Sequence, residues 1–256
     1  MPLLAVTWSG PEHSERARCI AEDLPLPLAG PADGTWPHLL VVDSGALRIT
    51  STGKGAPGPI LVDFAAARLS RRYRGGGELL TRACGIKSGK RPGILDATAG
   101  LGTDAFLLAY HGSALELCER DPLVAALLAD GIRRGEQAEQ AGVSEAVARM
   151  SLRQTDAVTL LESRSPQSVD VVYLDPMFPR DRRSAKAKKE MNLLQTLLPE
   201  SIPSPGLLPA ALRAAAGRVV VKRGIKAAAL DDRAPAFTLK GRSVRFDVYL
   251  GGSAPQ

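Results

Sequence analysis

Apolar and polar positions alternate along this chain with two different periods. Short apolar runs of strand length occur at 93–96, 114–118, 150–154, 169–174 and 218–222. Segments with helical spacing of apolar residues lie between them, at 103–111, 122–134, 135–149 and 157–163. Strands joined by helices at this spacing predict an α/β fold with a mostly parallel, doubly wound sheet. Two further runs, 236–240 and 244–250, predict a C-terminal antiparallel hairpin instead of another helical crossover.

The first part of the chain has a different character, because it is rich in proline and in turn residues. Short β-like runs occur there at 4–8, 38–43, 46–50 and 60–63. We therefore predict a small β-containing N-terminal subdomain over 1–62 and a main α/β domain over 63–256. Between 64 and 84 the pattern is helical, interrupted by Gly75-Gly76-Gly77. That triplet is either a break between two helices or a place where a ligand approaches the backbone.

Residues 93–104 predict a strand, a tight turn and the start of a helix. The strand ends in Asp96, and Gly100 and Gly102 allow a sharp turn whose main-chain N–H groups face a ligand. The spacing also fits the G-x-G-x-x-G/A pattern, which by itself does not separate nicotinamide cofactors from S-adenosylmethionine. Asp104 at the helix start disfavours a pyrophosphate and favours a ligand that carries an amine or a sulfonium.

Three further predicted strands also end in acids, at the sheet edge where α/β proteins bind ligands. Glu119 lies 23 residues after Asp96 and is suited to accept hydrogen bonds from both ribose hydroxyls of a nucleoside. Asp156 follows the third strand and is suited to accept from an adenine amine. Asp175 follows the fourth strand, which is almost entirely apolar, as expected for a buried parallel strand.

The segment Asp175-Pro176-Met177-Phe178 points to recognition of a base. An exocyclic amine needs two acceptors to hold its hydrogens, and the Asp175 carboxylate and the Pro176 carbonyl supply them. Phe178 is placed to stack on the base, which is worth about 1–3 kcal/mol. We therefore expect Asp175, Pro176 and Phe178 to form the catalytic group.

The formal net charge of +6 suggests an anionic partner such as nucleic acid. A basic run follows the base-recognition segment directly and makes phosphate contacts plausible. Its members are Arg180, Arg182, Arg183, Lys186, Lys188 and Lys189. Lys222 and Arg223, at the end of the fifth strand, are expected to face the same side and to bind RNA with them.

Other classes of protein are disfavoured. The three cysteines form no Cys-x-x-Cys pair and have no histidine nearby, so we expect neither a metal site nor a disulfide framework. Isolated cysteines fit a reducing cytosol, and the N-terminus lacks the basic and apolar regions of a signal peptide. No stretch approaches the ~18–20 apolar residues of a membrane span. We expect a cytoplasmic protein, and the sequence leaves its oligomeric state open.

Several of these segments together resemble the class I S-adenosylmethionine-dependent methyltransferases, and more narrowly the RsmJ-type guanine-N2 methyltransferases of 16S ribosomal RNA. The resemblance runs from about residue 60 to the end of the chain. Its motifs are 62–64, 75–77, 85–87, 96–102, 119–120, 171–179, 188–191 and 219–223. It implies a Rossmann-like fold and methyl transfer from S-adenosylmethionine to the exocyclic amine of one guanine in the small ribosomal subunit.

The resemblance also implies which residues contact the cofactor. They are Thr103, Asp104, Glu119, Arg120, Asp156, Ala157 and Asp175, in addition to Asp96, Gly100 and Gly102 of the turn. At two places this chain departs from the common family pattern, which has Arg in place of Thr103 and small hydroxyl residues in place of Asp156-Ala157.

Two other functions remain open at this stage. A nicotinamide-dependent dehydrogenase would share the glycine turn and Glu119, but it would leave residues 175–179 and the basic run unexplained. A non-catalytic RNA-binding protein with a methyltransferase-like fold would bind RNA without transferring a methyl group.

Overall fold

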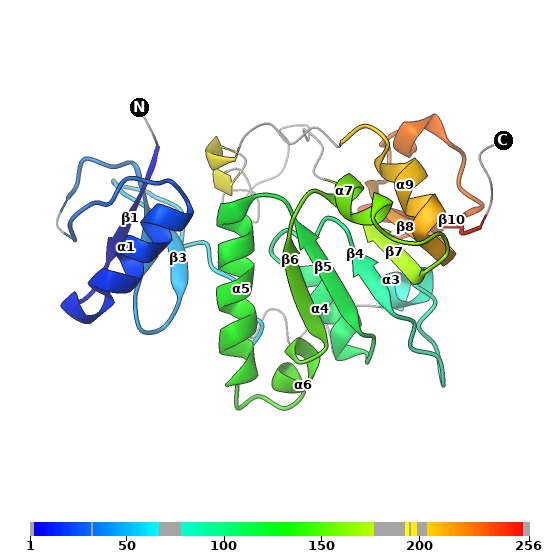
Figure 1. Cartoon of the computed structure of the whole chain (residues 1–256), viewed down its shortest axis with the longest axis horizontal. Helices are drawn as coiled ribbons and strands as arrows, with labels where there is room; N and C mark the ends of the chain where they lie inside the picture. The colour runs from blue at the N-terminus through cyan, green and yellow to red at the C-terminus, as the bar shows by residue number, and fades with distance from the viewer. Residues whose placement is uncertain are drawn as a thin grey trace.

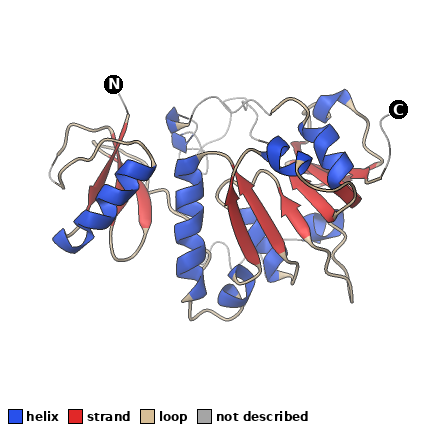
Figure 2. Ribbon diagram, viewed as in Figure 1, coloured by secondary structure: helices blue, strands red, loops and turns tan. Residues whose placement is uncertain are grey.

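The computed structural model describes residues 3–31, 33–66, 78–176, 193–194, 196–198 and 204–252. These residues form a small three-stranded sheet near the N-terminus and a seven-stranded sheet covered by helices (Figure 1). Strands and helices alternate through the large sheet, as Figure 2 shows.

The small sheet contains three strands in the order β1-β2-β3. Strand β1 (Leu4–Trp8) pairs in parallel with β2 (His38–Val42), which pairs antiparallel with β3 (Leu47–Ser51). These strands confirm the β-like runs predicted at 4–8, 38–43 and 46–50. The short 3₁₀ helix η1 (Pro11–His13) and the helix α1 (Ser14–Asp23) connect the first two strands.

Two features of this region differ from the prediction. Helix α1 was not expected, because its buried residues are only Ala17 and Ala21, so its apolar stripe is thin in the sequence. The run 60–63 is not a strand: Ile60 forms an isolated antiparallel bridge with Ile49, and the backbone then leaves the sheet.

The large sheet has the strand order β6-β5-β4-β7-β8-β10-β9. Its strands are β4 (Ile94–Asp96), β5 (Leu115–Glu119), β6 (Met150–Gln154), β7 (Val169–Leu174), β8 (Ala215–Gly224), β9 (Phe237–Lys240) and β10 (Val244–Leu250). The first five are parallel, whereas β10 is antiparallel to both β8 and β9. The predicted α/β fold, with a mostly parallel sheet and a C-terminal antiparallel hairpin, is thus confirmed.

Helices cover both faces of this sheet (Figure 1). They are α3 (Glu78–Ala83), α4 (Thr103–Tyr110), α5 (Pro122–Glu136), α6 (Val143–Val147), α7 (Ala157–Glu162), α9 (Leu207–Ala214) and the 3₁₀ turn η2 (Leu230–Asp232). Helices α4, α5 and α6 share one core with the sheet residues Leu117 and Tyr173, and α7 and α9 share the other with Leu174 and Val221. Helix α9 was not predicted.

Helix α5, which packs on the large sheet, also contacts the small sheet through Asp130. The carboxylate of Asp130, whose side chain is 3% exposed, accepts hydrogen bonds from the Leu47 N–H of β3 at 2.9 Å and from Arg16 of α1 at 3.0 Å. Arg133 and Arg134 of the same helix bind this carboxylate at 2.9 Å. Since these contacts join the two parts closely, the division of the chain near residue 62 stays a prediction.

The order of the strands determines where a ligand can enter. Strand β4 has β5, the next strand in the chain, on one side and β7 on the other. The connections therefore leave β4 in opposite directions, and this opens a crevice at the carboxyl ends of β4 and β7. Asp96 ends β4 and Asp175 directly follows β7, so both acids lie at this switch point.

Candidate functional site

The turn after β4 depends on its two glycines. Gly100 has φ +54° and Gly102 has φ +72°, a region that favours glycine. A Cβ atom on Gly102 would lie 2.5 Å from Cδ1 of Leu128 and 3.3 Å from Cζ of Phe64, so this glycine is required for packing. A Cβ atom on Gly100 would meet no heavy atom within 4 Å. At Gly102 the turn therefore packs against Leu128 and Phe64. At Gly100 the described residues leave space on the side of the crevice.

Glu119, at the end of β5, holds the turn in place. Its Oε2 accepts a hydrogen bond from the Gly100 N–H at 2.9 Å, and its Oε1 accepts one from the Asp121 N–H at 2.8 Å. Burial raises the pKa of the Glu119 carboxyl, although these backbone hydrogen bonds oppose the shift. The acid expected to bind a ribose thus lies directly beside the open glycine.

Asp96 is the most enclosed acid of the site, at 2% exposure. Its Oδ1 accepts a hydrogen bond from the Thr98 N–H at 3.1 Å. Burial raises the pKa of this carboxyl well above its usual value, and the negative charges of Asp104, Asp175 and Glu119 raise it further. Four acids predicted from the sequence as site residues therefore surround one small region at the switch point.

A hydrogen-bonded network connects the turn after β4 with the turn after β7. The Asp175 N–H donates to Thr98 Oγ1 at 2.6 Å. Lys222 Nζ lies 2.8 Å from Asp175 Oδ2 and 2.6 Å from Asp104 Oδ2. The hydroxyl of Tyr173 donates to the same Asp104 oxygen at 2.8 Å. The two predicted halves of the site are thus joined by direct contacts.

The matches to known proteins decide the family. Residues 26–251 match the family model described as "Putative SAM-dependent methyltransferase". Ribosomal RNA small subunit methyltransferase J of Thioalkalivibrio sulfidiphilus is 43% identical over 255 residues, covering 97% of this chain and 98% of that protein. The chain belongs to this methyltransferase J family.

Other relatives agree with this placement. The protein of the same name from Ectopseudomonas mendocina is 45% identical, covering 93% of this chain and 90% of the relative. A crystal structure of the SAM-dependent methyltransferase NGO1261 from Neisseria gonorrhoeae superposes with a TM-score of 0.73 at 31% identity, covering 98% of each chain. The cofactor of this methyltransferase is therefore S-adenosylmethionine, as the sequence predicted.

The geometry of the switch point fits that cofactor. S-adenosylmethionine carries ribose hydroxyls, an ammonium and a sulfonium, and carboxylates such as those of Asp96, Glu119 and Asp175 are suited to bind these groups. Among the described residues, no heavy atom lies within 4 Å of a Cβ atom placed on Gly100, so this part of the turn leaves room for a ligand to approach the backbone. Lys222 contacts Asp104 and Asp175, and a cationic ligand would in addition favour the ionised forms of Asp96 and Glu119, whose pKa values burial raises. We propose that Asp96, Gly100, Glu119 and Asp175 hold the cofactor.

Asp104 has a different environment from the expected one. It is 8% exposed, and one of its oxygens already binds both Tyr173 and Lys222. Its carboxylate thus helps to organise the network behind the crevice. The preceding residue, Thr103, begins α4 and is half-buried beside the turn.

The ends of β5 and β6 are linked by a residue that the sequence did not single out. Ser204 Oγ donates to Asp156 Oδ2 at 3.1 Å, and Arg120 Nη1 lies 3.5 Å from the same hydroxyl. Asp156 Oδ1 accepts from the N–H groups of Val158 and Thr159 and caps α7, which begins at Ala157. Arg120, Asp156 and Ala157 thus form one rim of the crevice, where a cofactor role for them stays a proposal.

The structure corrects the expected position of two basic residues. Lys222 and Arg223 were expected to face RNA together, but neighbouring residues of a strand point to opposite faces. Lys222 turns inward to Asp104 and Asp175. Arg223 is 7% exposed, and its Nε donates to the Ala228 carbonyl at 2.9 Å on the other side of the sheet. Neither side chain lies on an open surface for phosphate.

Other predicted residues lie outside the described part of the chain. They are Phe178, Arg180, Arg182, Arg183, Lys186, Lys188, Lys189 and the glycine triplet 75–77. Pro176, which follows Asp175, is described and buried.

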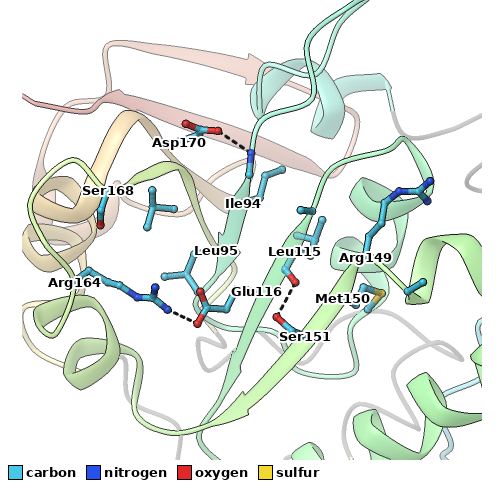
Figure 3. A pocket seen from close by; sticks show the side chains of 14 residues that line it. Ile94, Leu95, Leu115, Glu116, Arg149, Met150, Ser151, Arg164, Ser168 and Asp170 are labelled. Atoms are coloured by element: carbon cyan, nitrogen blue, oxygen red, sulfur yellow. Dashed lines mark hydrogen bonds and ion pairs between the residues drawn. The ribbon is translucent and has the colours of Figure 1, made fainter.

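A separate pocket lies at the opposite, amino-terminal ends of β4 to β7 (Figure 3). Its volume is about 640 Å³, and it is lined in part by Leu95, Glu116, Ser151 and Arg164. Arg164 forms an ion pair with Glu116 across it. None of the predicted cofactor residues lines this pocket, so it is distinct from the crevice at the switch point.

The described residues contain no sign of a membrane-spanning helix or of a metal cluster. None of their helices has the length and apolar character needed to cross a membrane. Within the same residues, no group of three His, Cys, Asp or Glu side chains has the arrangement of a metal site.

Sequence reasoning missed three polar residues of the site. Thr98 stands between the acid and the first glycine of the turn, and Tyr173 is the one residue with a polar tip in the run Val171–Leu174. Both positions could have been recognised as polar exceptions in apolar surroundings. Ser204 gave no comparable signal, because nothing in the sequence indicates that it reaches Asp156.

Proposed function

We propose that this methyltransferase transfers a methyl group from S-adenosylmethionine to the exocyclic N2 amine of a specific guanosine in 16S ribosomal RNA, in the cytoplasm. The observation that carries the proposal is the direct link between the glycine turn and the Asp175-Pro176 turn through Thr98. It brings the predicted base-binding group beside the predicted cofactor crevice. The relatives named ribosomal RNA small subunit methyltransferase J support the class of substrate.

The chemistry explains why these residues suit an amine. The lone pair of guanine N2 is conjugated with the ring, so the nitrogen is a poor nucleophile. Asp175 and the Pro176 carbonyl accept its two hydrogens, and this orients the lone pair toward the methyl group. The cofactor supplies an electrophilic methyl: a C–N bond forms, the C–S bond breaks, and N2 loses one proton to Asp175 or to water. Positioning supplies much of the rate.

The base has to leave its stack in the RNA to reach this crevice, as other base-modifying enzymes require. We propose that Phe178 stacks on the extruded base and that the basic residues of 180–189 bind the flanking phosphates. Both roles concern residues outside the described ranges, and they rest on the sequence alone.

Mass mapping of 16S ribosomal RNA tests the proposal. RNA from cells that lack the protein should lack one methylguanosine, which wild-type protein restores and Asp175→Ala does not. Asp170→Ala, at the opposite end of the same strand, is the matched control and should restore it. Purified Asp175→Ala should still bind S-adenosylhomocysteine in a calorimetric titration. A complete set of methylguanosines in the deletion strain, or normal modification by Asp175→Ala, would refute the assignment.

A further inference from the structure

Neither the packing of the sheet nor a contact with RNA explains why a lysine stands at position 222. In the parallel pairing of β7 with β8, Leu174 lies opposite Val221. The next residues along the two strands are Asp175 and Lys222, and Nζ of Lys222 lies 2.8 Å from Oδ2 of Asp175. The Lys222 side chain is 17% exposed. The register of the sheet therefore places the largely buried Lys222 beside Asp175, the proposed catalytic acid.

A second acid, Asp104, also holds the ammonium group of Lys222 in place. Asp104, in the first turn of α4, binds Lys222 Nζ at 2.6 Å and accepts the hydroxyl proton of Tyr173 at 2.8 Å. Burial alone would lower the pKa of Lys222, but the charges of Asp104 and Asp175 outweigh it and raise this pKa. Burial raises the pKa of Tyr173 well above its usual value, so the phenol stays a donor. Lys222 thus stays protonated, and Asp104 and Asp175 fix the position of its Nζ.

Stability alone does not explain this buried pair of charged residues. A buried ion pair is often no more stabilising than apolar residues of similar size, and a strand end here could be apolar, as at Val219–Val221. The titratable groups whose electrostatics involve Asp175 come from four elements, namely Asp96 of β4, Asp104 of α4, Tyr173 of β7, and Lys222 and Arg223 of β8, although the Arg223 side chain is directed to the Ala228 carbonyl. Lys222 is the cation among them that contacts the Asp175 carboxylate directly.

We propose that Lys222 is a positioning residue for methyl transfer: anchored by Asp104, it fixes Oδ2 of Asp175 and keeps this carboxylate ionised for the target amine. The inference rests on the proposed function of Asp175. It replaces a phosphate contact by Lys222, the alternative that the sequence suggested, and the two roles predict different kinetics.

Lys222→Met tests the positioning role, because Met has a similar length without the charge. We expect kcat for RNA methylation to fall about 100-fold, as for the loss of one preorganised electrostatic contact, with the KM for RNA unchanged. The acid limb of the pH profile of kcat should move to higher pH, because the positive charge of Lys222, 2.8 Å from Oδ2, then no longer favours the ionised form of Asp175. Lys222→Arg, which keeps the charge, should restore part of the rate.

A phosphate contact would behave differently. Its loss would raise the KM for RNA and lower the slope of log affinity against log salt by about one, with kcat unchanged. That result, or wild-type kinetics in Lys222→Met, overturns the positioning role.

A second variant and a second measurement guard against misfolding. Lys222→Met removes a positive charge beside two carboxylates, whereas Asp104→Asn combined with Lys222→Met removes one charge of each sign. The double variant should fold, bind S-adenosylhomocysteine and still show the low kcat; a return to the wild-type rate would overturn the proposal.

Apoprotein labelled with ¹³C at the aspartate carboxyl carbons gives a readout that is independent of turnover. The Asp175 signal, identified by its absence from Asp175→Asn, should titrate at a higher pH in Lys222→Met than in wild type, and an identical titration would contradict the proposal. Failure of the proposed function is distinguishable, because wild-type protein would then not methylate the RNA at all.

Discussion

Thr98 Oγ1 accepts a 2.6 Å hydrogen bond from the backbone N–H of Asp175, across the boundary between the first and fourth strands of the parallel sheet. The contact joins two turns that are 77 positions apart in the sequence. One turn carries the glycines of the cofactor crevice and the other carries the acid that we propose for the target amine. A side chain of one turn thus sets the position of the other.

Replacing Thr98 should therefore affect transfer more than cofactor binding. Thr98→Val keeps the shape but removes the acceptor, and an unpaired N–H of this kind costs about 1–3 kcal/mol. We expect kcat to fall about tenfold or more in single-turnover methylation. Thr98→Ser retains the hydroxyl and serves as the control, with a rate close to wild type. A Thr98→Val enzyme of unchanged kcat would show that the contact has no role in positioning Asp175.

The two glycines of the turn should respond differently to alanine. Gly102→Ala places a methyl group 2.5 Å from Leu128 Cδ1 at positive φ, so overpacking adds to backbone strain, and we expect a loss of about 2–4 kcal/mol in the free energy of unfolding. Gly100→Ala meets no heavy atom of the described residues within 4 Å, so we expect the cost to be the strain of positive φ, about 1–2 kcal/mol.

Gly100→Ala should instead lose affinity for S-adenosylhomocysteine, because its methyl group projects into the crevice. Urea unfolding and calorimetric titration of both variants measure the two effects separately. If Gly100→Ala binds the ligand as well as wild type does, the ligand does not approach this glycine.

Affinity for a cationic ligand should increase with pH. Burial raises the pKa values of Asp96 and Glu119, so both carboxyls take up protons more readily than free acids do. A ligand with an added positive charge favours the ionised forms and must displace these protons. Its affinity therefore falls as the pH drops and the acids become protonated, and its binding releases protons.

The measurement compares S-adenosylhomocysteine with sinefungin, which carries an extra ammonium near the position of the transferred methyl. The ratio of their affinities should grow in favour of sinefungin between about pH 5 and about pH 8. In Glu119→Gln the ratio should change less. A constant ratio in wild type would mean that these carboxyls do not sense the charge of the ligand.

Asp130 should contribute to stability in a pH-dependent way. Burial alone would raise the pKa of this carboxyl, but the hydrogen bonds from Arg134, Leu47 and Arg133 outweigh it and lower the pKa to about 2. The stabilisation is present above the unfolded value near 4 and is lost as the pH falls from there toward 2. A shift of this size corresponds to about 2 kcal/mol.

Asp130→Asn should thus lower the free energy of unfolding by about 2 kcal/mol or more at neutral pH, and by less near pH 3. Glu136→Gln, at the exposed end of the same helix, is the control and should change little. Urea denaturation at several pH values checks both. Equal destabilisation by Asp130→Asn at every pH would contradict the electrostatic explanation.

The sequence predicted what depends on neighbouring residues. The apolar run that ends in Asp175 and the turn at Gly100 and Gly102 are local patterns, so the strand ends and the acids there could be placed on one edge. The contacts of Lys222 depend on the register of β8 against β7, and no local pattern contains that information. For the same reason its inward direction, and the opposite direction of Arg223, emerged only from the structure.

Helix α1 and the contact of Ser204 show a second limit. The buried residues of α1 are two alanines, whose small side chains give only a weak amphipathic pattern. The pairing of Ser204 with Asp156 required two loops, far apart in the sequence, to meet at one rim.

The antiparallel pairing of β8 with β10 affects when the enzyme becomes competent during its synthesis. Strand β8 has β7 as its partner first. Its second neighbour, β10, begins at Val244, whereas β8 ends at Gly224, and Phe246 of β10 pairs with Lys222. Because chains are made from the N-terminus, a nascent chain that already contains the glycine turn and Asp175 still lacks the strand that holds Lys222 from the other side. A chain interrupted before β10 would thus keep the cofactor motifs but leave β8 as an exposed edge, prone to pairing with other chains.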